Sequence, residues 1–215
     1  GELRAASLQG LRLLVPTNVV MDGMDDSVAA AWQRALSLMY AAGVQITEAV
    51  VPPFSELAQI NAKGGFTAAE AWAWHRSHID GAGRLAEYDP RVGTRILRGK
   101  DISAADYIEL LARRQQWIAR VEAQMADHDL MLMPTVPVIA PKIAELQASD
   151  EAYFAANGLM LRNPTLINFL DGCAVSLPCH RAGEAPVGLS LAGLAGQDQR
   201  LLSMALAVET LLAQA

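Results

Sequence analysis

Short apolar runs alternate along the chain with longer stretches in which apolar residues recur every three or four positions. The run Leu11–Val15 predicts a buried strand. Residues 28–39 have apolar side chains at helical spacing, with Asp25 or Asp26 in place to cap the helix. Residues 44–51 alternate weakly and predict a second strand. Strand, helix and strand within about forty residues form a βαβ unit, which implies a parallel pair.

The middle of the chain predicts helices. Residues 55–80 have helical character interrupted by Gly64-Gly65, and residues 81–99 are mixed and rich in loop signals. Ser103 and Asp106 resemble a capping box with Asp in place of Glu. They open a long amphipathic helix that is expected to run to about residue 126.

The last third of the chain adds strands, helices and one proline-rich loop. The expected elements are a buried strand at 130–133, a loop at 136–141, helical segments near 150–162 and 164–170, strands at 174–177 and 187–191, and a helix capped by Asp198. The fold class is therefore α/β, with about five short buried strands between amphipathic helices.

Composition narrows the class of protein. Of the 215 residues, 52% are hydrophobic and 19% charged, which is typical of a globular chain, and the formal net charge is −6. No Lys/Arg run suits direct nucleic-acid binding, and no apolar run approaches the ~18 residues of a membrane span. The two cysteines, Cys173 and Cys179, are too sparse for a disulfide framework, which favours the reducing cytoplasm.

Few residues suggest chemistry by themselves. His75 and His78 lie three apart on an expected helix, but no further ligands accompany them, so neither a metal nor a cofactor is expected. Cys179 and His180 are adjacent, and neighbours on an extended chain point to opposite faces, which disfavours a thiol–base pair. No GxSxG elbow is present, and Ser190 falls within an expected strand.

Five segments in order resemble those of the amidase-signature family. Leu11–Pro16 resembles "LRIGVP", and Gly99–Tyr107 resembles "G..ISAADY". Asp129–Pro137, followed by an Ala-Pro pair, resembles "YDVLLTPTTP…AP". Asn168–Pro178 is similar to "N..G.PALSVP", and Pro186–Gly193 is similar to "PVGLQLIG". Each match is weak alone, but an ordered set over nearly the whole chain is specific.

The resemblance implies a large mixed β-sheet flanked by helices, to which residues 1–215 supply the C-terminal portion. It also implies hydrolysis of an amide through an acyl-enzyme, using two serines and a lysine that lie upstream of the matched segments. No adjacent serines occur here, and Lys63, Lys100 and Lys142 lie outside the family's lysine context. No catalytic residue is therefore expected in this chain, which would need the N-terminal half of the same enzyme as its partner.

Active-site clefts of α/β folds are built from loops at strand ends, so the candidate residues of the substrate pocket are Arg95, Thr135, Asn168 and Asp171. Arg95 occupies a position similar to an arginine that grips the substrate carboxylate in tRNA-amidotransferase A subunits, although a surface ion pair is the more ordinary explanation for an arginine. The acidic residue that those subunits use for the substrate amino group would align near Leu161, which cannot hold an ammonium group.

Three interpretations follow. The first is the C-terminal portion of an amidase acting on a small-molecule amide, alone or as a homodimer. The second is a fragment of an aspartyl/glutamyl-tRNA amidotransferase A subunit, which Leu161 disfavours. The third is a non-catalytic scaffold domain that shares the fold.

Overall fold

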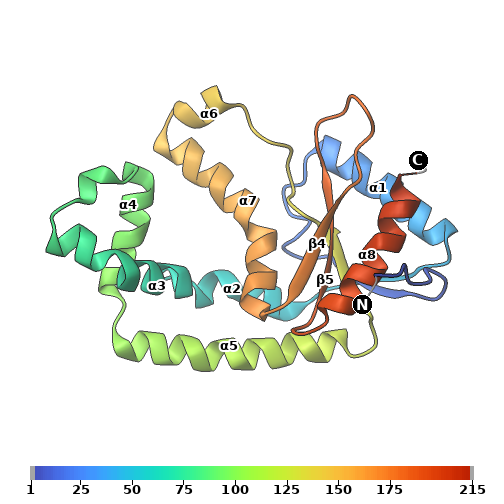
Figure 1. The fold of residues 1–215 in the computed structure, drawn as a ribbon, viewed down its shortest axis with the longest axis horizontal. Helices are drawn as coiled ribbons and strands as arrows, with labels where there is room; N and C mark the ends of the chain where they lie inside the picture. Colours follow the sequence, from blue (N-terminus) through green and yellow to red (C-terminus); the bar gives the residue numbers. More distant parts are fainter. Residues whose placement is uncertain (1–2, 214–215) are drawn as a thin grey trace. The chain divides into compact units, whose positions relative to one another are not determined.

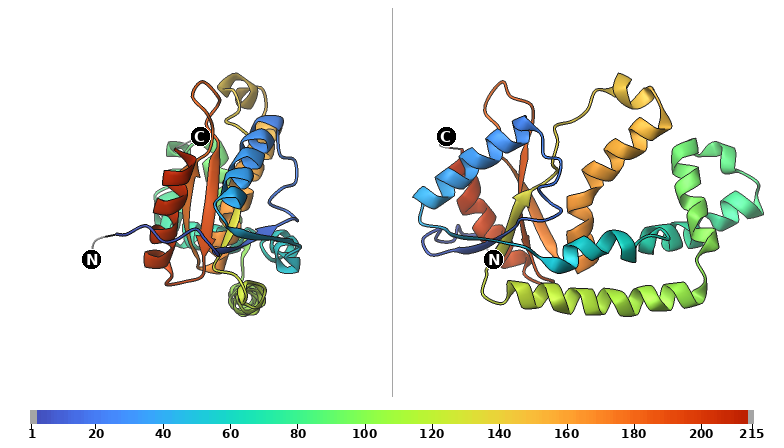
Figure 2. Two further views of the ribbon diagram at one scale, coloured as in Figure 1. Left: turned by 90° about the vertical axis from the view of Figure 1, so that its right-hand side faces the viewer. Right: turned by 180° about the vertical axis from the view of Figure 1, so that it is seen from behind.

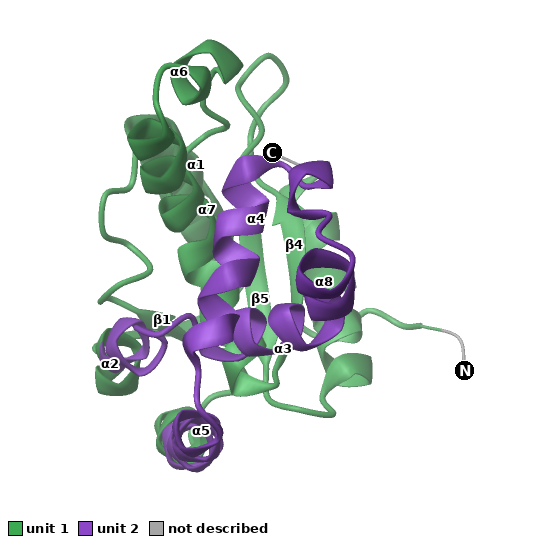
Figure 3. Cartoon of the chain, turned by 90° about the vertical axis from the view of Figure 1, so that its left-hand side faces the viewer, with its two compact units in different colours: residues 1–55, 118–215 green, residues 56–117 purple. Residues whose placement is uncertain are grey.

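The computed structural model describes residues 3–213, and the chain divides into two compact units (Figure 3). Unit 1 comprises Gly1–Ser55 and Ile118–Ala215, and unit 2 comprises Glu56–Trp117. Unit 1 contains the sheet, and unit 2 is helical.

The secondary structure follows the predicted order with few differences (Figure 1). The strands are β1 Arg12–Pro16, β2 Gln45–Ala49, β3 Leu130–Pro134, β4 Cys173–Pro178 and β5 Gly188–Gly193. The α-helices are α1 Asp26–Ala41, α2 Pro52–Ile60, α3 Gly65–Arg76, α4 Pro90–Leu97, α5 Ala104–Met125, α6 Ile143–Gln147, α7 Asp150–Leu170 and α8 Asp198–Leu212. A π-helical turn covers Ser77–Gly81, and 3-10 turns cover Leu85–Glu87 and Arg98–Asp101.

The strands of the described residues form one mixed sheet in the order β2-β1-β3-β5-β4 (Figure 2). β2, β1 and β3 are parallel, as the βαβ pattern predicts. β5 runs antiparallel to both β3 and β4, and the loop of residues 179–187 joins β4 to β5 as a hairpin. The α/β fold class with a mixed sheet is therefore confirmed.

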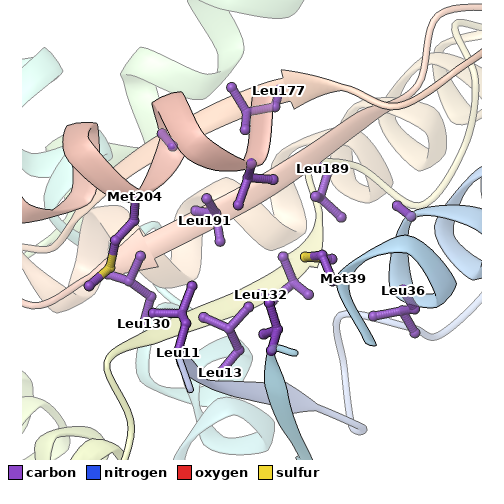
Figure 4. Packing of buried hydrophobic residues seen from close by; sticks show 14 of the residues in the cluster. Leu11, Leu13, Leu36, Met39, Leu130, Leu132, Leu177, Leu189, Leu191 and Met204 are labelled. Atoms are coloured by element: carbon purple, nitrogen blue, oxygen red, sulfur yellow. The ribbon is translucent and has the colours of Figure 1, made fainter. Parts of the chain in front are cut away.

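One face of this sheet forms the main hydrophobic core under α1 and α8. The side chains that meet there come from alternate positions of four strands and from one face of each helix (Figure 4); they include Leu11, Leu13, Leu36, Met39, Leu130, Leu132, Leu177, Leu189, Leu191 and Met204. β3 is buried at all five positions, as its unbroken apolar run predicts.

The opposite face of the sheet, near β4 and β5, receives the C-terminal part of α7. The expectation of two helical segments separated near Pro164 is wrong, because α7 is continuous from Asp150 to Leu170 with this proline inside it. A proline removes one backbone donor from a helix but need not end it where packing stabilises both sides. Here Asn163 and Leu166, on either side of the proline, are buried.

The predicted helix starts are mostly confirmed. Asp25 caps α1, and its carboxylate accepts a 2.7 Å hydrogen bond from the N–H of Val28. Ser103 and Asp106 form the capping box: the N–H of Asp106 donates to the Ser103 hydroxyl at 3.1 Å, and the N–H of Ser103 donates back at 3.1 Å. Asp198 is wrong as a cap, because Gln197 holds that position and accepts instead from the N–H of Leu194.

Unit 2 departs from the sequence prediction in one element. Residues 81–99 were expected to be mainly loop but contain α4, whose N-cap Asp89 accepts hydrogen bonds from the N–H groups of Arg91 and Val92. The Asp-Pro pair at its start is a helix signal in the sequence. The expected break at Gly64-Gly65 is confirmed, since Gly64, the residue before α3, and Gly65, its first residue, both have a positive φ. Over the described residues, no helix combines the length and apolar character that crossing a bilayer requires.

Candidate functional site

A pocket of about 270 Å³ lies in unit 1 where α7 meets the open face of β3, β4 and β5. Its lining combines three hydroxyl side chains and two amides with a larger apolar part, to which Met133, Pro164 and Ile167 contribute. The residues around it are Met133, Thr135, Asn163, Pro164, Ile167, Asn168, Gly172, Ala174, Ser176 and Ser190. Pockets at strand ends of α/β sheets are common ligand sites, so this is the candidate site of unit 1.

Thr135 and Ser176 form the centre of the hydroxyl wall. Their Oγ atoms are 2.6 Å apart, although the residues are 41 positions apart in sequence. The N–H of Thr135 donates to the Gly188 carbonyl at 2.9 Å, which ties the end of β3 to β5. A Cβ atom at Gly188 would lie 2.5 Å from the Ser176 Oγ and 2.8 Å from the Thr135 Oγ1. Glycine is therefore required for this pair of hydroxyls to meet over β5.

Asn163 holds the back of the pocket in place. Its side chain is fully buried, and its Nδ2 donates to two carbonyl oxygens, that of Pro134 at 2.9 Å and that of Val20 at 3.1 Å. Its Oδ1 accepts from Arg162 at 3.2 Å. A buried amide with every contact satisfied fixes the positions of its partners. Asn163 thus fixes Pro134, the residue before Thr135, and the loop after β1. These hydrogen bonds of Asn163 are called the Asn163 clamp.

The loop after β1 carries backbone strain beside this clamp. Val19 has a φ of 64°, in the left-handed region that disfavours β-branched residues. Such a conformation costs on the order of 1–3 kcal/mol and persists only when surrounding contacts enforce it. The next residue, Val20, supplies those contacts, because its carbonyl accepts from both Asn163 and Arg162.

The four residues expected at the pocket occupy three different places. Thr135 and Asn168 line the same pocket. Asp171 is the C-cap of α7, with a φ of 62° and an N–H that donates to the Asn168 carbonyl, and it does not line the pocket. Arg95 is half-buried in the last turn of α4, in unit 2. Their role in binding substrate stays a prediction.

Sequence reasoning missed three polar residues of this wall. Ser176 and Ser190 lie directly opposite each other in the β4–β5 register, so strand alternation places both on the pocket face. That signal was available once the hairpin was recognised. Asn163 carried no local signal, because its partners lie 29 and 143 positions away.

The other side chains considered for chemistry have different partners. His75 Nδ1 lies 2.9 Å from the Tyr88 hydroxyl, and His78 Nε2 lies 2.8 Å from the Glu87 carboxylate, so the two imidazoles are engaged separately. Burial raises the pKa of the Cys179 thiol to about 11, and the His180 Nδ1 lies near the Val187 backbone instead. A neutral thiol is a poor nucleophile, in agreement with the expectation from the sequence. Among the described residues, no group of three or more His, Cys, Asp or Glu side chains is placed to hold a metal ion.

The structure is that of an α/β protein with an uncharged pocket, lined in part by hydroxyls, on the open face of β3, β4 and β5. The chain belongs to the amidase family, whose model, described as "Amidase", matches residues 2–202. This confirms the resemblance drawn from the five sequence segments.

Individual relatives agree with that assignment. The chain is 33% identical over 208 residues to 2-amino-5-chloromuconic acid deaminase from Comamonas testosteroni, covering 96% of this chain and 44% of the relative. It is 27% identical to the A subunit of glutamyl-tRNA(Gln) amidotransferase from Symbiobacterium thermophilum, covering 94% and 45% respectively. The fold matches allophanate hydrolase from Kluyveromyces lactis with a TM-score of 0.83 at 22% identity, covering 98% of this chain and 33% of that one. The chain therefore spans less than half the length of these relatives.

Proposed function

We propose that residues 1–215 are the C-terminal portion of an amidase that hydrolyses the carbon–nitrogen bond of a small-molecule amide. The observation that carries this proposal is family membership combined with length: the match covers nearly the whole chain but only 44% of the deaminase. The remaining part of such an enzyme would supply the catalytic Ser-Ser-Lys group and form an acyl-enzyme.

The lysines of the chain support placing catalysis elsewhere. Lys63 Nζ lies 2.7 Å from the Asp106 carboxylate, and Lys100 Nζ lies 2.7 Å from the Asp80 carboxylate. Lys142 is exposed just before α6. A lysine that acts as a base must be neutral and within about 3 Å of the nucleophile, and a carboxylate partner stabilises its charged form instead.

In this proposal the pocket around Thr135 and Asn168 forms one wall of the substrate site. Hydroxyls and amides donate and accept hydrogen bonds without charge, which suits orientation of an amide group. Asp171 and Arg95 are proposed to contribute through parts of the site completed by the rest of the enzyme. Arg95 would hold a substrate carboxylate if one is present.

The outer strand β4 offers a place for that remaining part to bind. β4 is at the edge of the sheet, and its residues Ala174, Ser176 and Pro178 are exposed on the face that bears the pocket. An edge strand presents backbone donors and acceptors that a further strand can pair with. We propose that the N-terminal half of the enzyme pairs here and closes the pocket.

The test compares this chain with a full-length parent that carries the upstream half. A serine-directed phosphonate and an amide such as phenylacetamide would be applied to both proteins. We expect stoichiometric labelling of a serine upstream of residue 1 in the parent, and neither labelling nor hydrolysis with the chain alone. Labelling of any serine within residues 1–215 would overturn the proposal.

The similarity to the amidotransferase supports a second candidate, a fragment of its A subunit. The side chain of Leu161 is 42% exposed on α7 and apolar, which does not suit recognition of the substrate ammonium group. A glutaminase assay of the parent, with and without partner subunits, separates the two: glutamine hydrolysis that depends on partners would favour the amidotransferase.

A further inference from the structure

A second cavity of unit 1 shares no lining residue with the pocket under α7 that contains Thr135, called the Thr135 pocket. It lies among α1, the end of α8 and the loop that joins β4 to β5, and its volume is about 900 Å³. That volume falls within the range of roughly 300–1,000 Å³ that small-molecule sites occupy. The family-based proposal gives this cavity no role.

The floor of the cavity is apolar. It contains Ala35 and Leu38 from α1, Leu212 from α8 and the side chain of Cys179. Ala35 is buried, whereas the two leucines are half-buried and therefore partly open to the cavity. The Cys179 thiol is neutral and donates to the Val187 carbonyl at 3.6 Å. Such a floor favours the hydrocarbon part of a ligand.

The rim of the cavity is cationic, although the chain as a whole has a formal charge of −6. Arg34 and Arg181 lie in the lining together with His180, and no Asp or Glu lies in it among the described residues. Arg34 is paired with Glu184, so the Arg181 guanidinium is the cation of the lining that favours an anion, and a carboxylate fits the donor geometry of arginine.

Glu184, just outside the lining, orders this rim. Its carboxylate forms an ion pair with Arg34 of α1 and accepts a 2.9 Å hydrogen bond from the backbone N–H of Arg181. The loop is thereby attached to α1 at the place where Arg181 extends from it. Because Arg34 is engaged by Glu184, Arg181 is the cation better placed to hold an incoming anion.

We propose that this cavity binds a small organic monocarboxylate with an aliphatic body. The Arg181 guanidinium holds the carboxylate, and the hydrocarbon chain lies along Leu38 and Leu212. The ligand class follows from the pairing of a cationic rim with an apolar floor, and the site is independent of amide hydrolysis.

Octanoate titrated into the chain, followed by calorimetry and by amide NMR shifts, tests the proposal. We expect saturable one-to-one binding with shifts at Leu38, Arg181 and Leu212. Arg181→Gln should weaken binding about tenfold or more, because it removes a charge-assisted hydrogen bond. Octan-1-ol should bind weaker by a similar factor.

Two matched variants sharpen the test. Arg4→Gln removes the same charge from an exposed position outside the lining and should leave octanoate binding unchanged. Leu212→Ser should weaken octanoate more than acetate, since only the longer ligand reaches the floor. Absence of saturable binding, equal binding by Arg181→Gln, or shifts confined to the Thr135 pocket would each overturn the proposal.

Discussion

The carboxylate of Asp129, at the entrance to β3, accepts a 2.8 Å hydrogen bond from the backbone N–H of Arg12 at the start of β1. The Arg12 guanidinium donates to the same carboxylate at 3.1 Å, and Arg200 of α8 also forms an ion pair with it. One side chain thus connects two neighbouring strands and the helix that covers them. The side chain of Asp129 is only 12% exposed, whereas those of Arg12 and Arg200 are each 48% exposed, so solvent screens the two ion pairs in part.

Replacing this carboxylate should destabilise unit 1. Asp129→Asn is expected to lower the free energy of unfolding by about 2 kcal/mol, because hydrogen bonds to a charged, largely buried acceptor are lost. Urea denaturation measures the change. Asp127→Asn, at an exposed position two residues earlier, is the control and should change it by less than ~0.5 kcal/mol. Equal effects of the two variants would contradict a specific role for Asp129.

Acid should remove the same contribution in the wild-type protein. Burial by itself would raise the pKa of Asp129, but hydrogen bonds and charge from Arg12 outweigh it and hold that pKa below its ordinary value. A carboxyl group with a lowered folded pKa stabilises the fold above its unfolded value of about 3.9 and ceases to do so as pH falls through the folded value. The stability difference between wild type and Asp129→Asn should therefore be full at pH 7 and shrink below pH 4. A constant difference down to pH 2 would be inconsistent with this linkage.

Asp106, in unit 2, should also titrate below the ordinary range of an aspartate. Hydrogen bonds from Lys63 and Ser103 lower the pKa of Asp106 to about 2. The side-chain resonance of Asp106, followed by NMR, should titrate near that value, well below an ordinary aspartate. Ser103→Ala should raise this pKa and cost about 1 kcal/mol through loss of the N-cap. An unchanged titration in Ser103→Ala would show that the capping box does not set it.

The clamp at the back of the pocket should be intolerant of charge. Asn163→Asp replaces the amide donor that serves Val20 and Pro134 with a buried carboxylate facing two carbonyl oxygens. We expect a loss of about 3 kcal/mol in the free energy of unfolding. Asn168→Asp, on an exposed position of the same helix, is the matched control and should have little effect on stability. Similar losses in both variants would argue against the clamp.

The contact of Thr135 with Ser176 should depend on glycine at position 188. Gly188→Ala forces a methyl group against both hydroxyls and should cost about 1–3 kcal/mol. Gly158→Ala makes the same substitution at an exposed position inside α7 with no atom within 4 Å of the new Cβ, and should stabilise by about 0.5–1 kcal/mol. Opposite signs in the two variants are the expected result of denaturant titration.

The Cys179 thiol should react slowly. With its pKa raised to about 11 by burial, it carries about one hundredth of the thiolate of an ordinary cysteine at pH 8. The rate of iodoacetamide alkylation at Cys179, followed by peptide mass spectrometry, should be lower than that of an ordinary cysteine by about that factor. In urea, which exposes the thiol, the rate should rise to the ordinary value. Alkylation at the rate of a free thiol peptide would contradict the burial of this side chain.

Local sequence patterns determined most of the elements. The apolar run of β3, the Asp25 cap of α1 and the capping box of α5 depend on residues at most four positions apart. Each can therefore be predicted from the sequence without knowledge of the fold. The local prediction of a helix break near Pro164 was wrong, because the continuity of α7 depends on packing against distant segments. The family resemblance likewise needed only ordered motifs.

The pocket was decided by tertiary structure. Thr135 meets Ser176 across the sheet, and Asn163 bonds carbonyls from two segments far from it in sequence. Four residues were predicted to form the substrate pocket, and of these Thr135 and Asn168 line the Thr135 pocket, whereas Arg95 and Asp171 do not. Periodicity reports which face of an element a side chain occupies, but the neighbour it meets there depends on strand order and register, which are set only when the whole sheet assembles.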